Sequence, residues 1–163
     1  MSTEHGQETW LRTIEPGLVE IERQDLLFGG SFLSGKDGPV VARYYRAADQ
    51  SVIGKVFFGP QTEGAPGIAH GGAMAALLDE LMGIAVWSTG CAAFSTDLHV
   101  HFRKMLAVPK RYIGESRIER IEGRKVWTKG RLRAVDGDTV YVEAEGLYVE
   151  MVDRKNLVPT ALV

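Results

Sequence analysis

The stretch that decides the fold is residues 71–87, GGAMAALLDELMGIAVW. Its apolar residues would occupy nearly every direction around a helix axis, and a helix that is apolar all round is buried. We therefore predict a buried helix from about Gly71 to Thr89, with Gly90 as its C-cap. Asp79 and Glu80 lie in its middle, where a charge is costly unless it is paired, hydrogen-bonded or neutralised. Adjacent helical residues point about 100° apart, so at most one carboxylate should face a shared cleft. Either could instead meet water or a nearby arginine at the rim of the helix.

The sequence on both sides of this helix predicts strands. Residues 94–102 alternate, which places Phe94 and Phe102 on one face and Ser95 on the other with Asp97, His99 and His101. A change of apolar phase in the last strand predicts a β-bulge at Gly146. The expected strands are residues 40–46, 51–58, 94–102, 112–121, 125–135 and 139–151, with turns at Glu122-Gly123 and Asp136-Gly137. Short hairpin connections imply an antiparallel sheet, and one helix on its face gives an α+β fold. The opposite face of the sheet should remain partly apolar, and oligomerisation commonly covers such a face.

Length and composition place limits on the class of protein. A chain of 163 residues with 45% hydrophobic and 25% charged residues is expected to form one globular domain. Its net charge of −2 argues against a nucleic-acid partner. The apolar stretch is shorter than a membrane span, and the first residues lack the pattern of a signal peptide, so a soluble, cytoplasmic protein is expected.

The expected organisation has three parts. Residues 1–45 form an N-terminal extension, with a loose lead-in over 1–16, a short helix over 17–27 and a glycine-rich loop or hairpin after it. Residues 46–155 form the main domain, and residues 156–163 form a tail.

The start of the central helix is a candidate ligand site. No Ser, Thr, Asp or Asn directly precedes Gly71, so no standard side-chain cap is expected. The first amides of a helix lack internal partners and lie at the positive end of its dipole. Gly71 and Gly72 would let a carbonyl oxygen that gains negative charge during acyl transfer approach those amides. Alternatively, the two glycines only permit tight packing or a sharp turn.

The spacing of Gly71 and Asp79 has a consequence for assembly. Eight residues along a helix separate them by roughly 12 Å, too far for both to act on one carbonyl group. If both are catalytic, they must come from two subunits whose helices run antiparallel across a two-fold axis. This predicts an obligate dimer with composite sites.

Residues 64–72 (GAPGIAHGG) and 77–79 (LLD) together resemble the hotdog-fold acyl-CoA thioesterases of the PaaI-like group. Ser95-Thr96-Asp97-Leu98 also fits, and the resemblance covers roughly residues 50–151. It implies an antiparallel sheet wrapped around the long helix, dimerised edge to edge, as a dimer or a dimer of dimers.

The resemblance also implies a function, the hydrolysis of acyl-CoA thioesters without metal or cofactor. Asp79 would be the general base or nucleophile, the Gly71 amide would polarise the thioester carbonyl, His70 would shape the site, and Ser95 would help to hold the water. Gly64 departs from members that carry an asparagine at that position. The residues expected to bind substrate, with two cations for the phosphates of coenzyme A, are Gly72, Thr96, Asp97, Lys104 and Arg124.

Several alternatives remain open at this stage. Asp97, His99 and His101 could hold a metal ion, or they could form the polar outer face of a half-buried strand. A non-catalytic hotdog module that binds acyl-CoA as a sensor is the main rival, although a buried carboxylate favours an enzyme. A Ser-His-Asp hydrolase is less favoured because no G-x-S-x-G motif is present. A hotdog dehydratase or hydratase is less favoured because that chemistry usually needs a histidine paired with an acid, in a different motif. Six apolar residues could line an acyl pocket or equally build the core: Phe57, Phe58, Met74, Leu78, Met82 and Trp87.

Overall fold

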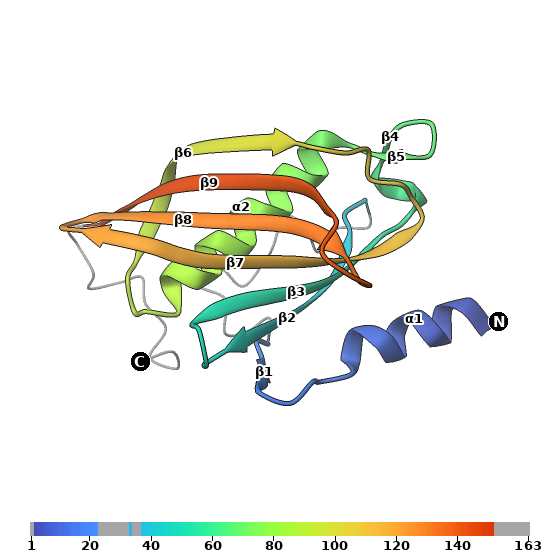
Figure 1. Cartoon of the computed structure of the whole chain (residues 1–163), viewed down its shortest axis with the longest axis horizontal. Coiled ribbons are helices and arrows are strands. Elements are labelled where there is room, and N and C mark those ends of the chain that lie inside the picture. Colours follow the sequence, from blue (N-terminus) through green and yellow to red (C-terminus); the bar gives the residue numbers. More distant parts are fainter. Residues whose placement is uncertain (1, 23–32, 34–36, 152–163) are drawn as a thin grey trace.

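A computed structural model describes residues 2–22, 33 and 37–151 (Figure 1). Two helices are present in this part of the chain, α1 (Ser2–Arg12) and α2 (Gly71–Trp87). A 3₁₀ turn covers Pro60–Thr62. The strands are β1 (Leu18–Glu20), β2 (Val40–Arg46), β3 (Ser51–Phe58), β4 (Glu63–Ala65), β5 (Ile68–Ala69), β6 (Ala93–Phe102), β7 (Lys110–Glu122), β8 (Lys125–Ala134) and β9 (Val140–Glu150).

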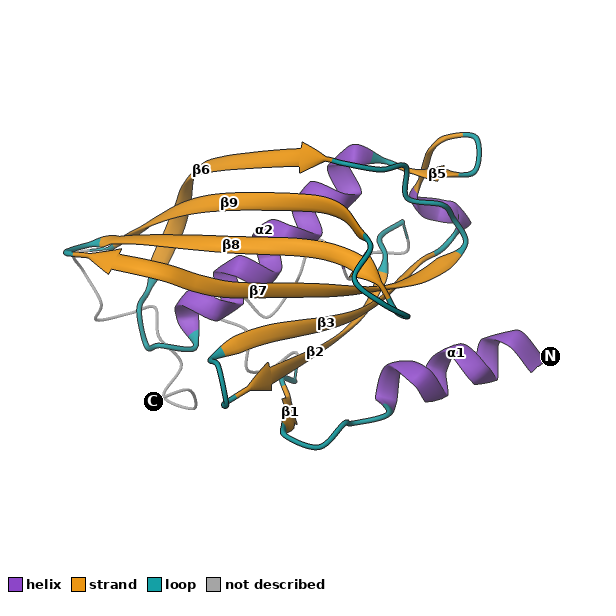
Figure 2. Ribbon diagram, in the orientation of Figure 1, coloured by secondary structure: helices purple, strands orange, loops and turns teal. Residues whose placement is uncertain are grey.

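The main sheet has seven strands in the order β1-β2-β3-β7-β8-β9-β6. Every neighbouring pair is antiparallel. The sheet curves around α2, as Figure 2 shows. β4 and β5 form a small separate hairpin directly before α2. The expected α+β architecture, an antiparallel sheet wrapped around one long helix, is confirmed. No helix among the described residues has both the length and the apolar character needed to cross a membrane.

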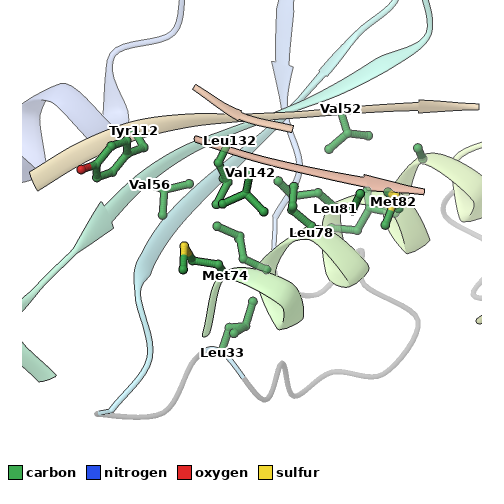
Figure 3. Close-up of a cluster of buried hydrophobic side chains, with 14 of the residues drawn as sticks. Leu33, Val52, Val56, Met74, Leu78, Leu81, Met82, Tyr112, Leu132 and Val142 are labelled. Carbon is green, nitrogen blue, oxygen red and sulfur yellow. The ribbon is translucent and has the colours of Figure 1, made fainter. Parts of the chain in front are cut away.

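The core lies between α2 and the concave face of the sheet (Figure 3). Met74, Leu78 and Met82 of α2 and Phe58 of β3 are buried in it, so these four candidate pocket residues build the core. Gly114 of β7 shows how closely the layers approach, because a Cβ there would lie 2.5 Å from Cδ1 of Leu81. The all-round apolar sequence of α2 is thus explained by packing against a sheet that curves around it.

The N-terminal region differs from the prediction. Residues 2–12, expected as a loose lead-in, form α1, whereas residues 18–20, expected in a helix, form β1. Gly17 has a φ of +85°, which interrupts any helix there, and β1 pairs with β2. The expected glycine-rich loop or hairpin falls largely on residues 23–32 and 34–36, and the expected C-terminal tail falls on residues 156–163. These residues lie outside the described part of the chain.

β2 crosses the expected boundary at residue 45. It pairs with β3 along its whole length, from Val40 opposite Phe57 to Arg46 opposite Ser51. The main sheet therefore begins before residue 46.

The outer face of the sheet is less apolar than expected. At one end, α1 covers a small cluster of Tyr44, Ile53 and Ile113, against which Trp10 packs. Across β7, β8 and β9 the same face carries cross-strand ion pairs, such as those of Glu115 with Arg131 and Arg133. Charged side chains, and α1 at one end, therefore cover much of the face that we expected to be apolar and buried by oligomerisation.

The predicted turns are confirmed, whereas the predicted bulge is not at Gly146. Gly123 and Gly137 have positive φ angles between the expected strands. Gly146 sits in regular pairing between Leu98 and Thr128. The buried face of β9 runs without interruption through Val142, Ala144, Gly146 and Tyr148.

Candidate active site

Asp79 is half-buried in the middle of α2 and has one close polar neighbour from the sheet. The hydroxyl oxygen of Tyr148, on β9, lies 2.7 Å from Oδ1 of Asp79 and 2.8 Å from its main-chain carbonyl oxygen. Burial, with the Asp79 charge and the hydrogen bond to it, raises the pKa of Tyr148 well above its ordinary value. The phenol therefore keeps its proton, and one carboxylate oxygen of Asp79 has a permanent potential donor.

Glu80, the neighbouring carboxylate, is held by a different part of the molecule. Nε of Arg43, on β2, donates to Oε1 of Glu80 over 2.5 Å, and the guanidinium also forms an ion pair with it. The two adjacent carboxylates thus have partners on different strands, Asp79 on β9 and Glu80 on β2. The alternative expectation, that a carboxylate of this helix pairs with a nearby arginine, therefore holds for Glu80.

The start of α2 has a side-chain cap that the sequence did not predict. Nδ1 of His70 accepts a hydrogen bond from the Gly72 amide over 2.9 Å. When the imidazole is neutral, its proton is therefore on Nε2, which becomes a second donor at this position. Gly72, predicted to bind substrate, already donates its amide hydrogen to this cap.

The Gly71 amide, the first of α2, is not used by the His70 cap. Within the described part of the chain it has no hydrogen-bond partner. Phe102 of β6 lies beside this position, since a Cβ at Gly71 would be 3.3 Å from Cζ of its ring. An aromatic ring and the Gly71 amide therefore lie side by side at this end of α2.

The loop before α2 holds His70 in place. The His70 amide donates to the Thr62 carbonyl over 2.7 Å, and the Ala69 amide donates to the Leu106 carbonyl over 2.8 Å. Gly64 packs directly on His70, where a Cβ would lie 2.9 Å from the His70 Cα. The glycine at position 64, noted as a departure from the family pattern, is therefore required by the position of the histidine.

Ser95 lies on the opposite face of β6 from the one predicted. The register of β6 with β9 shifts between Ser95 and Asp97, which leaves Thr96 as the extra residue of a bulge. Ser95 is directly opposite Tyr148 in this ladder, and opposed residues share a face. The bulge therefore turns Ser95 towards the α2 side of the sheet, whereas Asp97, His99 and His101 face outwards.

The other predicted substrate-binding residues are spread over the molecule. The Thr96 hydroxyl donates to the Leu147 carbonyl over 3.1 Å, and Asp97 pairs with His99 on the outer face. Lys104 follows the end of β6, whereas Arg124 lies at the β7–β8 turn and donates to the Glu150 carbonyl. The end of β6 and the β7–β8 turn are at opposite ends of the sheet (Figure 1), so one chain does not bring these two cations together.

A hollow of about 480 Å³ lies on the outer face, lined largely by charged side chains such as Arg46, Glu115 and Arg131. It includes none of the residues around Asp79 or Gly71. Across the described residues no group of three or more His, Cys, Asp or Glu side chains could hold a metal ion.

Tyr148 is the site residue that the sequence analysis missed. The assumed phase change at Gly146 put Leu147 and Val149 on the core side and Tyr148 on the other. Unbroken period-two alternation through Val142, Ala144, Gly146 and Tyr148 would have placed Tyr148 on the core side. That prediction requires Gly146 to count as a small core residue.

Part of the chain matches a known protein family. Residues 66–141 match the model of the thioesterase superfamily. This chain contains a thioesterase superfamily domain. The match spans the loop with Gly67, His70 and Gly71, all of α2, and most of the strands that pack on it.

Related proteins carry the same assignment. Acyl-coenzyme A thioesterase THEM4 from Bos taurus is 31% identical over 158 residues, which are 95% of this chain and 65% of that protein. This chain therefore spans just under two thirds of that relative's length.

Solved structures agree on the fold. A thioesterase superfamily protein of known crystal structure aligns with a TM-score of 0.64 and 31% identity, over 68% of this chain and 53% of its own. The PaaI protein of the E. coli phenylacetic acid degradation operon aligns with a TM-score of 0.59 and 13% identity, over 63% of this chain and 74% of its own. The PaaI likeness concerns the hotdog fold alone, and it agrees with the resemblance found in the sequence.

Proposed function

We propose that this protein hydrolyses acyl-coenzyme A thioesters to the free acid and coenzyme A. The observation that carries the proposal is the Gly71 amide, which has no hydrogen-bond partner among the described residues and starts the helix that also holds Asp79. The activity named for the THEM4 relative supports the choice of substrate. A cytoplasmic location stays a prediction from the sequence.

The proposed reaction needs one carboxylate and one oxyanion site. Asp79 takes a proton from water, and the resulting hydroxide adds to the thioester carbon. The Gly71 amide donates to the oxygen that becomes negative, and the neutral His70 ring offers Nε2–H beside it. Collapse of the tetrahedral intermediate expels a thiolate, which is a good leaving group and needs little protonation. The alternative role of Asp79, direct attack on the thioester carbon, uses the same residues.

The proposed active unit is a homodimer, or a dimer of dimers, with composite sites. Gly71 and Asp79 on one helix are roughly 12 Å apart by helix geometry, so the pair that meets one carbonyl comes from two chains. β6 forms an edge of the described sheet, and Phe94 and Phe102 on it are 39% and 54% exposed. A second copy that pairs along this edge would cover these rings.

The test is the release of free thiol from a panel of short, medium, long and aromatic acyl-CoA thioesters. We expect turnover of at least one member, with acid and coenzyme A formed in equal amounts. Binding of acyl-CoA with no turnover of any member would contradict hydrolysis and favour the sensor.

A further inference from the structure

We propose that Tyr148 is a positioning residue for Asp79, one that holds the carboxyl group in the same place in both of its protonation states. The inference rests on the proposed function, because it concerns Asp79 as the base of that reaction. It also assigns a role to a residue that lies 69 positions from Asp79 in the chain.

The Tyr148 hydroxyl has more acceptors within reach than it has hydrogens. The Tyr148 hydroxyl lies within hydrogen-bond distance of two acceptors on Asp79, Oδ1 at 2.7 Å and the carbonyl oxygen at 2.8 Å. A phenol has one hydrogen, so it donates to only one of them at a time. The oxygen keeps lone pairs with which it can also accept.

In each charge state of Asp79, a different placement of the hydrogens satisfies the hydrogen bonds between Asp79 and Tyr148. When Asp79 is ionised, the hydroxyl donates to Oδ1. After Asp79 has taken a proton, its own O–H donates to the Tyr148 oxygen, and the Tyr148 hydrogen turns to the Asp79 carbonyl. Only hydrogens move between the two states. A general base passes through both states in each turnover, so this partner keeps it aligned throughout.

The ring of Tyr148 is fixed by its surroundings. Tyr148 is 2% exposed, and it lies over Gly146 of its own strand and Gly83 of α2. A Cβ at Gly146 would be 2.9 Å from Cε2 of the ring. The hydroxyl oxygen is thus placed by close packing, as a positioning residue requires.

Ser116 provides a matched control for the structural part of this contact. Its buried hydroxyl, on β7, donates to the Leu81 carbonyl of α2 over 2.7 Å. Like Tyr148, it joins the sheet to a main-chain oxygen of the same helix. Unlike the Tyr148 hydroxyl, the Ser116 hydroxyl forms no hydrogen bond with a carboxylate among the described residues.

The experiment compares Tyr148→Phe and Ser116→Ala with the wild type and combines each with Asp79→Asn. We expect Tyr148→Phe to lower kcat about 10- to 100-fold with KM within about twofold, since a misplaced reacting group costs rate more than binding. Ser116→Ala should lower the melting temperature and leave kcat near the wild-type value. In the Asp79→Asn background, Tyr148→Phe should cause no further loss, because both changes remove the same aligned base.

Three results would overturn the inference while leaving the function intact. They are wild-type kcat in Tyr148→Phe, an equal loss in Ser116→Ala, or a loss that multiplies with that of Asp79→Asn. An inactive wild type would instead reject the proposed function.

If Tyr148→Phe does not fold, 3-fluorotyrosine at position 148 replaces it. This residue preserves the ring and both contacts and makes the oxygen a weaker acceptor. Kcat should then fall severalfold with KM unchanged, and an unchanged kcat would count against the proposal.

Discussion

Gly64 lies so close to His70 that a Cβ at position 64 would be 2.9 Å from the His70 Cα and 3.1 Å from Cδ2 of its ring. His70 caps α2 and directly precedes Gly71, the proposed amide donor. The geometry of the proposed oxyanion site therefore depends on a residue with no side chain of its own.

The first prediction follows from this contact. Gly64→Ala should displace His70 and lower kcat/KM about tenfold, because small misplacements of an oxyanion donor are costly. Ala65→Ser, on the exposed next residue, is the matched control and should behave as the wild type. Full activity in Gly64→Ala would show that the position of His70 does not matter for catalysis.

The second prediction concerns composite sites. Gly71→Pro removes the proposed donor at a helix position that tolerates proline, and His70, with φ −64° and ψ 133°, has the extended backbone that a residue before proline requires. Gly71→Pro and Asp79→Asn should each be nearly inactive alone. Mixing them should restore one complete site in each heterodimer, which gives a heterodimer about half of the activity of a wild-type dimer. Subunit exchange is verified with a mass-tagged chain. Verified exchange without recovered thiol release would contradict a site shared between chains.

The third prediction tests how α1 is held on the outer face. Lys55 is 2% exposed; its Nζ donates to the Thr13 carbonyl over 2.6 Å, lies 3.2 Å from the Glu15 carboxylate and faces the Trp10 ring. Lys55→Met should lower the free energy of unfolding by about 1–3 kcal/mol, because the carbonyl loses its donor, while kcat is retained. Urea unfolding measures the effect, with exposed Lys125→Met as the control. An unchanged midpoint for Lys55→Met would mean that this buried lysine does not anchor α1.

How far the sequence predicted the molecule depends on which contacts set each element. The bounds of α2 followed from its all-round apolar composition and the β7–β8 and β8–β9 turns from their glycines, since these signals are local. α1 was missed because it packs through Lys55 and Tyr44, which lie far along the chain. Propensity and pattern within residues 1–16 do not contain that information.

The residues of the candidate site also differ in whether local sequence or long-range contacts place them. Asp79, His70 and Gly71 lie in one short stretch and were found together. Tyr148 and the orientation of Ser95 depend on how β9 pairs with β6. The bulge at Thr96 reverses the face of the preceding residues, and strict alternation cannot reveal it.

The fourth prediction is a pH dependence of stability. Hydrogen bonds from Arg46 and then Ser51 lower the pKa of Asp49 to about 2. A carboxyl whose pKa is depressed on folding stabilises the native state above its unfolded pKa, about 3.9, and that contribution is lost as the pH falls through about 2. Asp49→Asn should therefore be less stable than the wild type at neutral pH, by a modest amount because Asp49 is half exposed.

Urea midpoints of the two proteins at several pH values check this prediction. The difference should hold steady down to about pH 5 and shrink as the pH falls from about 4 towards 2. A difference that is constant across this range would contradict the role of the Asp49 charge.

The central claim is that Asp79 is the catalytic carboxylate, and the most direct measurement compares Asp79→Asn with Glu80→Gln in a thiol-release assay on one acyl-CoA that the wild type hydrolyses. Asp79→Asn should lower kcat by roughly 10²–10⁴, the range for loss of an acid–base group. Glu80→Gln should keep kcat and lose stability, because Glu80 pairs with Arg43. Near-wild-type turnover in Asp79→Asn, with the loss found in Glu80→Gln instead, would contradict the assignment.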